Sequence, residues 1–214
     1  RSPEPMKCRL TMMTTKPQLL FEESTHTYTL RREGLADIIL PSVTQIMEPL
    51  ERKVYGDISS FTLDSAADRG TRFHRAAEQY LKYGFRNVDD DCAGYFDGFL
   101  KFLADHPDWK PIHSEYRFYH KAFLYAGTAD LLMETPSGIM LIDFKTTAQA
   151  HTKLWGVQLA AYWRGIQNYS GSFDIQQAYV AQFDGRGECV LHEIKPNMPL
   201  FLSCLQIYNF KEDA

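Results

Sequence analysis

The segment that most constrains the fold of this chain is GTADLLMETPSGIMLIDFKTT, at residues 127–147. Two strand-like runs flank the tetrapeptide TPSG, a turn signal that predicts a tight connection between antiparallel strands. If the turn closes symmetrically about Pro136 and Ser137, Asp130 lies directly opposite Asp143 in the strand pair. Like charges in that arrangement destabilise a sheet. The hairpin must therefore contain something that offsets two adjacent carboxylates.

Three arrangements could offset them: one carboxyl is protonated, a basic residue pairs with them, or a divalent cation lies between them. Lys145 follows Asp143 by two residues, so the alternation of a strand places both on one face, together with Asp130. Hard oxygen ligands on strands suit Mg²⁺ or Mn²⁺. Lys145 could then orient or help deprotonate a metal-activated water. The alternative is a structural ion pair between Asp143 and Lys145, with Asp130 exposed at the end of the sheet.

Composition limits the class of protein. The chain has 214 residues, of which 44% are hydrophobic and 14% aromatic, which is typical of an ordered globular protein with one large domain or a domain plus a subdomain. No apolar run is long enough to span a bilayer, and the N-terminus lacks the apolar core of a signal peptide, so we expect no membrane association. The net charge of -4 means that nucleic-acid binding would need a local basic strip.

The cysteines are far apart and form no C-x-x-C pair, which indicates isolated thiols in a reducing compartment rather than a zinc or disulfide framework. They are Cys8, Cys92, Cys189 and Cys204.

Hydrophobic periodicity predicts a mixed α/β chain whose sheet begins with antiparallel strands. Ser42 is expected to act as the N-cap of a short helix that follows Pro41. The predicted elements, in chain order, are a small sheet or hairpin at 19–39, that helix, helices at 63–83 and 88–106, strands at 112–120, 125–134 and 139–145, a helix at 152–168, strands at 176–183 and 188–194, and a helix at 199–210.

Several motifs carry a resemblance to a known family. GTAD and DFKTT, followed by QLAAYW, resemble the PD-(D/E)XK nuclease superfamily and, more narrowly, its RecB-like and phage-type exonucleases. GTRFH resembles the early histidine motif of that family, and Gln158 and Tyr162 match its Q-xxx-Y helix. FEESTHTYTL and LPSVTQIM resemble the lead-in of phage and prophage members and of mitochondrial exonuclease relatives. The resemblance covers the chain from about Phe21 to Tyr162.

The resemblance implies a restriction-endonuclease-like core, with a mixed sheet that contains an antiparallel hairpin and is flanked by helices. It implies a single nuclease domain over residues 1–214, in which 1–62 form an N-terminal hairpin and helix lead-in and 63–214 form the catalytic core. The superfamily's proline is replaced by Ala129 in this chain. The cysteines that hold an iron-sulfur cluster in some relatives are absent, so we expect no cluster.

The resemblance also assigns roles. Asp130 and Asp143 would ligate Mg²⁺ or Mn²⁺, and His74 would complete the coordination from its helix. The Phe144 carbonyl would add an oxygen ligand, and Lys145 would be the catalytic lysine. Taken alone, a histidine such as His74 is more often a surface or packed residue than a ligand.

Two further sets of candidates have two interpretations each. Glu115 is either an exposed strand residue or a carboxylate that holds a second metal or bridges a water. Gln158 and Tyr162 are four residues apart and share a helical face. They are either core residues satisfied by hydrogen bonds or a pair that faces the active site and supports Lys145 or contacts a phosphate.

The remaining candidates are hydroxyl and basic residues. Thr146 and Thr147 would cap the segment that follows or bind a phosphate, and capping is the safer interpretation. Ser42 and Thr44 have the same two interpretations. The arginines near the His74 helix form either the local basic strip or an ordinary solvated helix face. These arginines are Arg69, Arg72 and Arg75.

The sequence therefore predicts a metal-dependent deoxyribonuclease, most simply an exonuclease acting on DNA ends or single strands in the cytoplasm of a bacterial or phage-infected cell, with roles in DNA recombination or repair and a possible recombination partner protein. The alternatives are a nuclease-like fold that binds DNA or protein without catalysis, and a structure-specific endonuclease. Polarity, strand preference and oligomeric state are not predicted, because fold does not dictate function.

Overall fold

The computed structural model describes residues 16–56 and 60–212, and the chain divides into two compact units, Arg1–Leu40 and Pro41–Ala214. The first unit is a three-stranded antiparallel sheet in the order β1–β2–β3. Burial alternates along β2, where Tyr28 and Leu30 are buried, as its period-two pattern predicts. The expected subdivision between residues 62 and 63 stays a prediction. The strands are β1 (Gln18–Glu22), β2 (Thr27–Arg31) and β3 (Ile38–Leu40).

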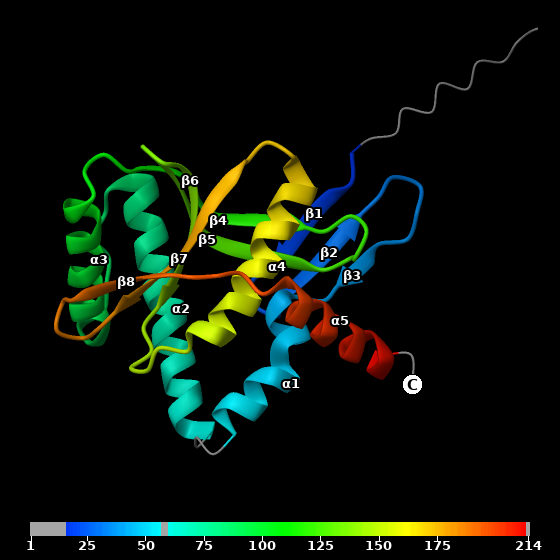
Figure 1. Ribbon diagram of the computed structural model, residues 1–214, viewed down its shortest axis with the longest axis horizontal. Helices are drawn as coiled ribbons and strands as arrows, with labels where there is room; N and C mark the ends of the chain where they lie inside the picture. The colour runs from blue at the N-terminus through cyan, green and yellow to red at the C-terminus, as the bar shows by residue number, and fades with distance from the viewer. Residues whose placement is uncertain (1–15, 57–59, 213–214) are drawn as a thin grey trace, which may run out of the picture. The chain divides into compact units, whose positions relative to one another are not determined.

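The second unit is built on a five-stranded sheet in the order β4–β5–β6–β7–β8. All neighbouring strands are antiparallel except β6 and β7, which are parallel. A parallel pair needs a long crossover, and α4 (Thr152–Ser170) provides it (Figure 1). The fold class is thus confirmed as α/β, with a mixed sheet that begins in an antiparallel hairpin. The strands are β4 (Lys110–Tyr119), β5 (Ala126–Thr135), β6 (Gly138–Lys145), β7 (Ile175–Phe183) and β8 (Cys189–Glu193).

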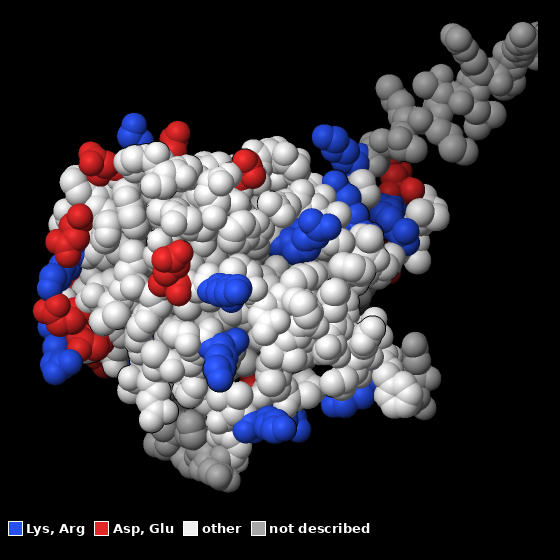
Figure 2. All heavy atoms as spheres, in the orientation of Figure 1, with Lys and Arg blue, Asp and Glu red and all other residues white. Residues whose placement is uncertain are grey.

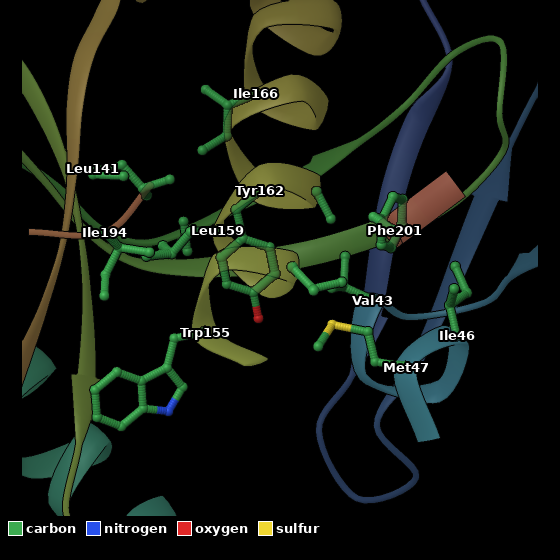
Figure 3. Packing of buried hydrophobic residues seen from close by; sticks show 14 of the residues in the cluster. Val43, Ile46, Met47, Leu141, Trp155, Leu159, Tyr162, Ile166, Ile194 and Phe201 are labelled. Carbon is green, nitrogen blue, oxygen red and sulfur yellow. The ribbon is translucent and has the colours of Figure 1, made fainter. Parts of the chain in front are cut away.

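Helices cover both faces of this sheet, because its strands are apolar on both sides. On one face, α1 (Val43–Tyr55), α4 and α5 (Met198–Glu212) pack with Leu132 and Leu141 of the sheet. Figure 3 shows Trp155 and Tyr162 of α4 in this core, together with residues of α1.

On the other face, α2 (Ser60–Tyr83) and α3 (Ala93–Asp105) lie side by side (Figure 1). Phe73 of α2 and Phe99 of α3 meet Phe144 of β6 in a cluster of edge-to-face rings. Such ring pairs add to the stability gained from burial alone. These ring contacts hold α2 and α3 against this face of the sheet.

Two helix starts test the capping predictions. Ser42 is the N-cap of α1 and forms a capping box, in which its hydroxyl accepts from the Gln45 amide and Gln45 accepts from the Ser42 amide. The cap prediction for Ser42 is confirmed. The helix predicted from residue 88 differs, because α3 begins at Ala93. Asp90 and Asp91 lie in η1 (Asp90–Cys92), a short 3-10 turn that precedes it.

The hairpin register is as predicted. Glu134 pairs with Ile139, and the two-residue connection lies at Pro136 and Ser137. Gly138 has a φ of 110°, a conformation that side-chain-bearing residues rarely adopt, so glycine suits the end of this turn.

The expectations about membrane-spanning helices and free thiols are compared with the described residues only. Within residues 16–56 and 60–212, no helix combines the length and the apolarity that a bilayer crossing requires. Three cysteines in this part of the chain, Cys92, Cys189 and Cys204, are free thiols. Cys8 lies outside the described residues.

Candidate metal centre

Three carboxylates form a row across β4, β5 and β6. The strand pairs on either side of Glu115 place it opposite Asp130 in the β4–β5 register. The β5–β6 register ends with the pair of Leu131 and Ile142, and its next position brings Asp130 opposite Asp143. Neither carboxylate pair belongs to the regular ladder. Sheet register thus gathers three acids at one edge of the hairpin.

The backbone is irregular at the same row. Glu115 has a φ of 50°, in the left-handed region that a non-glycine residue seldom occupies within a strand. Asp130 Oδ2 accepts a hydrogen bond of 2.6 Å from the backbone N–H of Phe144. A side chain therefore takes the place of a backbone partner here. Such local strain is typical of functional sites, where the surrounding structure holds it.

His74 approaches the row from α2. Its Nδ1 lies 3.2 Å from Asp130 Oδ1 and 3.8 Å from Glu115 Oε1. One ligand atom each from His74, Glu115 and Asp130 lie within 4.8 Å of one another. One imidazole and two carboxylates are a donor set suited to a divalent transition metal such as Mn²⁺. These residues can therefore hold a divalent metal ion.

Asp143 and Lys145 form the neighbouring part of the site. The Lys145 Nζ lies 2.6 Å from Asp143 Oδ2, and only 3% of the Asp143 side chain and 21% of the Lys145 side chain are exposed. Despite this ion contact, Asp143 Oδ2 accepts no hydrogen bond of good geometry. The Lys145 ammonium group is therefore the charged partner of this buried oxygen. The convergence expected from the strand alternation is present.

The residues gathered around His74 differ from the ligands expected from the sequence. Glu115, for which the sequence allows two interpretations, is one of the two carboxylates gathered around His74. Asp143 instead faces Lys145. The backbone N–H of Phe144 serves Asp130. The ligand roles of Asp143 and of the Phe144 carbonyl stay predictions.

The acids around His74 determine its charge. Burial acts to lower the pKa of His74, but the charge of Asp130, its hydrogen bond and the contact with Glu115 together raise that pKa to about 10. Burial conversely acts to raise the pKa of Asp130, and the charge and hydrogen bond of His74 outweigh it and lower the pKa. His74 must therefore lose a proton before it can ligate a metal, so metal binding would release protons.

The other acids are harder to ionise. Burial, with the adjacent charge of Asp130, raises the pKa of Asp143 to about 6 although Lys145 opposes this. Burial also raises the pKa of Glu115. Burial acts to lower the pKa of Lys145, but the charges of Asp143 and Asp130 raise it. Lys145 is consequently an ammonium group at neutral pH.

Two residues of α1 that the sequence did not single out lie within electrostatic range of Lys145. Burial raises the pKa of Glu51, and the Lys145 charge partly offsets this. Burial, with the charge of Glu51, raises the pKa of Tyr55, whose ring also contacts the His151 ring at 4.9 Å. The four-residue spacing of Glu51 and Tyr55 places them on one helical face. Nothing in that spacing indicates that the face would meet β6.

The pair in α4 is arranged as a hydrogen-bonded unit. Gln158 Nε2 donates to the Tyr162 hydroxyl at 3.0 Å, and Tyr162 is buried. The Tyr162 ring packs edge-to-face on Phe118 at 5.6 Å, within the core shown in Figure 3. This geometry places Tyr162 in the core, with its hydroxyl hydrogen-bonded, and leaves Gln158 half-buried beside it. Their support of Lys145 or of a phosphate stays a prediction.

The hydroxyl residues are placed as follows. Thr146 is buried, and the Thr147 hydroxyl donates to the Gln149 carbonyl at 3.2 Å. Neither caps α4, whose N-cap is His151, so the expected capping by these threonines is wrong for that helix. The intervening residues separate them from the helix start. Thr44 is exposed and lies 2.9 Å, hydroxyl to hydroxyl, from the capping residue Ser42.

The arginines of the proposed basic strip are in different environments. Arg72 contacts Asp68, Asp89 and Asp91 at 3.0, 3.1 and 2.6 Å, so three carboxylates offset its charge. Arg75 is exposed. Acidic and basic side chains are mixed at the end of the core that carries α3 (Figure 2). DNA binding by Arg72 and Arg75 stays a prediction, and Arg72 is the weaker candidate of the two.

Comparisons with known proteins add little to this geometry. No protein-family model and no curated protein matches the sequence. Among solved structures, the chain is partly similar to an alkaline exonuclease from Laribacter hongkongensis, with 10% identity and a TM-score of 0.41 over 80% of this chain and 87% of that one. It is also partly similar to the protein SSO0001, with 12% identity and a TM-score of 0.34 over 64% and 69% of the two chains. Similarities of this size carry no conclusion about activity.

Proposed function

We propose that this chain is a metal-dependent deoxyribonuclease that hydrolyses phosphodiester bonds, most simply as an exonuclease on DNA ends or single strands. The observation that carries the proposal is the row of Glu115, Asp130 and Asp143, with His74 at one side and Lys145 at the other. A structural ion pair would need only one acid for each base. A row that concentrates negative charge suits a divalent cation. The motif resemblance supports DNA as the substrate.

The residues would divide the work between them. His74, Glu115 and Asp130 would hold a divalent ion, with Asp143 as a further ligand, and a bound ion of this kind supplies a Lewis acid and lowers the pKa of water. Lys145, as an ammonium group, would stabilise negative charge that develops on the phosphoryl oxygens. Because its pKa is raised, Lys145 is better suited to this role than to accepting a proton.

Replacing Lys145 by alanine tests the catalytic role directly. We expect folding and Mn²⁺ binding to be largely preserved and DNA cleavage to fall by at least about 100-fold, the loss typical of one removed electrostatic donor. The assay uses end-labelled single-stranded and double-stranded DNA with Mg²⁺ or Mn²⁺, and it also reports direction. The matched control is Lys110→Ala, because Lys110 belongs to β4 but pairs with Glu134 at the opposite end of the sheet. Undiminished turnover in Lys145→Ala would refute the role.

Metal binding separates this proposal from its main alternative. A nuclease-like fold that binds DNA or protein without catalysis would not need the row to take up an ion. Calorimetric titration with Mn²⁺ should show binding in the unmodified protein and much weaker binding in Asp130→Asn. Absence of any Mn²⁺ binding would favour the non-catalytic module.

The choice between exonuclease and endonuclease rests on resemblance alone. Linear and covalently closed circular DNA of the same sequence distinguish the two, because an exonuclease requires an end. Cleavage of the circle at a rate similar to that of the linear form would assign a structure-specific or other endonuclease. The single-domain organisation, the cellular setting and a recombination partner remain proposals of the same kind.

A further inference from the structure

A cavity of about 260 Å³ opens at the end of β6, the strand that carries Asp143 and Lys145. Its walls come from α2, α3, the segment after β6 and the β7–β8 hairpin. Thr146, one of its lining residues, immediately follows Lys145 in the chain. The backbone at the cavity rim is therefore continuous with that of Lys145, while Arg69 lies on α2 five residues before His74.

Arg69 is the cationic residue of this cavity. Its guanidinium lies over the Tyr95 ring, 5.1 Å from the ring centre, and its Nη2 donates to the Thr146 carbonyl at 3.3 Å. Its Nε is buried without a hydrogen-bond partner, and no carboxylate in the described part of the chain forms an ion pair with it. A guanidinium carries five N–H donors, and the Thr146 carbonyl uses one of those on Nη2, so the two Nη groups retain donors for an anion.

The two acids of the cavity are neutralised by other groups. Asp184 accepts hydrogen bonds from the backbone and the guanidinium of Arg186 and from the backbone of Glu188, which closes the β7–β8 turn. Glu188 in turn pairs with Lys101 at 2.6 Å. The unpaired charge in the cavity is therefore the positive charge of Arg69. An anion would meet attraction from Arg69 and little opposing field.

Close contacts between neighbouring elements form the walls of the cavity. A side chain at Gly94 would lie 2.0 Å from the Gly185 carbonyl oxygen, so α3 and the β7–β8 turn can approach this closely only with glycine there. On the other side, Gln182 Nε2 donates to the Thr147 carbonyl at 2.7 Å. Between these walls, the lining includes the Tyr95 ring and the Val190 side chain.

We propose that this cavity is a nucleotide subsite, in which Arg69 binds a phosphate and Tyr95 and Val190 contact the attached sugar or base. The proposal rests on the proposed deoxyribonuclease function and assigns to the cavity one nucleotide of the bound DNA strand. The volume is close to the lower end of the range of about 300–1,000 Å³ for small-molecule pockets, so one nucleotide unit fits better than several. Aromatic contact with a base is sequence-tolerant, so the subsite would add affinity without base preference.

Binding of thymidine monophosphate to the full chain in EDTA tests the proposal without cleavage. Ligand-observed NMR compares this nucleotide with thymidine and with inorganic phosphate, and we expect the nucleotide to bind more tightly than either fragment. Arg69→Ala should weaken nucleotide binding about tenfold or more, because it removes a charge-assisted contact. Tyr95→Ala should weaken it several-fold. Val190→Glu, at a position that is 54% exposed, should weaken it by repulsion without disturbing the fold.

The matched control is Arg86→Ala. Arg86 also lies over an aromatic ring of α3, Phe96, at 5.6 Å and forms an ion pair, but it does not line the cavity. Its replacement should leave nucleotide binding unchanged. The proposal is overturned if thymidine monophosphate shows no binding, if inorganic phosphate binds as tightly as the nucleotide, or if Arg69→Ala and Val190→Glu both bind like the unmodified protein.

The outcome is separable from that of the proposed function. If the protein does not cleave DNA but Arg69→Ala still loses nucleotide binding, the subsite stands and the nuclease proposal fails. If the protein cleaves DNA and the cavity variants bind the nucleotide normally, the subsite alone fails. A short single strand in place of the mononucleotide then distinguishes a site for DNA from a site for free nucleotides, because only the former should gain affinity with chain length.

Discussion

At the turn end of the β5–β6 hairpin, residues 131–135 pair regularly with residues 138–142, whereas at the open end the same two strands carry Asp130 and Asp143 outside the regular ladder. Leu132 and Leu141 are fully buried at the turn end. At the open end, the neighbouring strand adds Glu115 with its left-handed backbone. One end of the hairpin is thus regularly paired and apolar, and the other end is irregular and acidic.

The difference indicates that the turn end serves the stability of the fold and the open end serves the candidate site. The turn end satisfies turn chemistry, register and packing together, as a segment that serves folding should. The open end breaks the ladder and places three acids in a row, and burial raises the pKa of two of them, Asp143 and Glu115. Functional sites often retain strained backbone and adjacent like charges, although both lower the stability of the folded state. Substitutions at the two ends should therefore change stability in opposite directions.

The largest expected effect is at the turn end. Leu141→Ala removes a fully buried side chain from β6 and should lower the free energy of unfolding by about 2–5 kcal/mol, through lost burial and the cavity left behind. Urea unfolding measures this change. Val190→Ala, at an exposed position of the same sheet, should stay within about 0.5 kcal/mol. A loss below about 1 kcal/mol for Leu141→Ala would mean that the turn end does not carry the stability assigned to it.

The open end should respond in the opposite sense. Asp143→Asn removes a charge that burial and Asp130 make unfavourable, so in EDTA at pH 7 the variant should be more stable than the unmodified protein. The gain is roughly 1.4 kcal/mol for each unit by which the pKa is raised. Asp105→Asn, at an exposed position, is the control. With saturating Mn²⁺ the unmodified protein should become the more stable of the two, because ion binding raises its free energy of unfolding more than that of Asp143→Asn.

The pH dependence gives the same prediction a second measurement. The pKa of Asp143 is raised to about 6 in the folded protein, and an unfolded aspartate titrates near about 3.9, so the folded state binds more protons between these values. The contribution of this group to stability is fully present below the unfolded value and is lost as the pH rises through about 6. The difference between the unmodified protein and Asp143→Asn should therefore grow from pH 4 to pH 7. A constant difference would contradict the assigned cause.

Turn chemistry and strand alternation predict the regularly paired end of the hairpin well. The TPSG turn sets the register, and the register alone brings Asp130 and Asp143 together. Ser42 is predictable as a cap because a hydroxyl before a helix satisfies orphan amides. His74 was identified through the GTRFH motif rather than through any spacing relation to the hairpin. These features are local in sequence or belong to a motif, so one sequence suffices to find them.

The irregular half depends on contacts between distant segments. Nothing about a glutamate signals a φ of 50° in a strand, so the row that includes Glu115 becomes visible only in three dimensions. The approach of Glu51 to Lys145 depends on how α1 packs. The sequence predicts Arg72 as part of a basic strip because its acidic partners Asp89 and Asp91 belong to another segment. Tertiary packing, not local propensity, decides each of these.

The smallest expected effect returns to the turn itself. The Thr135 hydroxyl donates to the Gly138 carbonyl at 2.8 Å and accepts from the Ser137 amide at 3.2 Å. Thr135→Val keeps the shape but removes both bonds, and should lower the free energy of unfolding by about 1 kcal/mol. DNA cleavage should not change, because the turn lies at the opposite end of the hairpin from Asp130. Thr135→Ser, which keeps the hydroxyl, should lose less stability than Thr135→Val. If Thr135→Val instead impaired cleavage as strongly as Lys145→Ala, the two ends of the hairpin would not be the independent regions that this comparison requires.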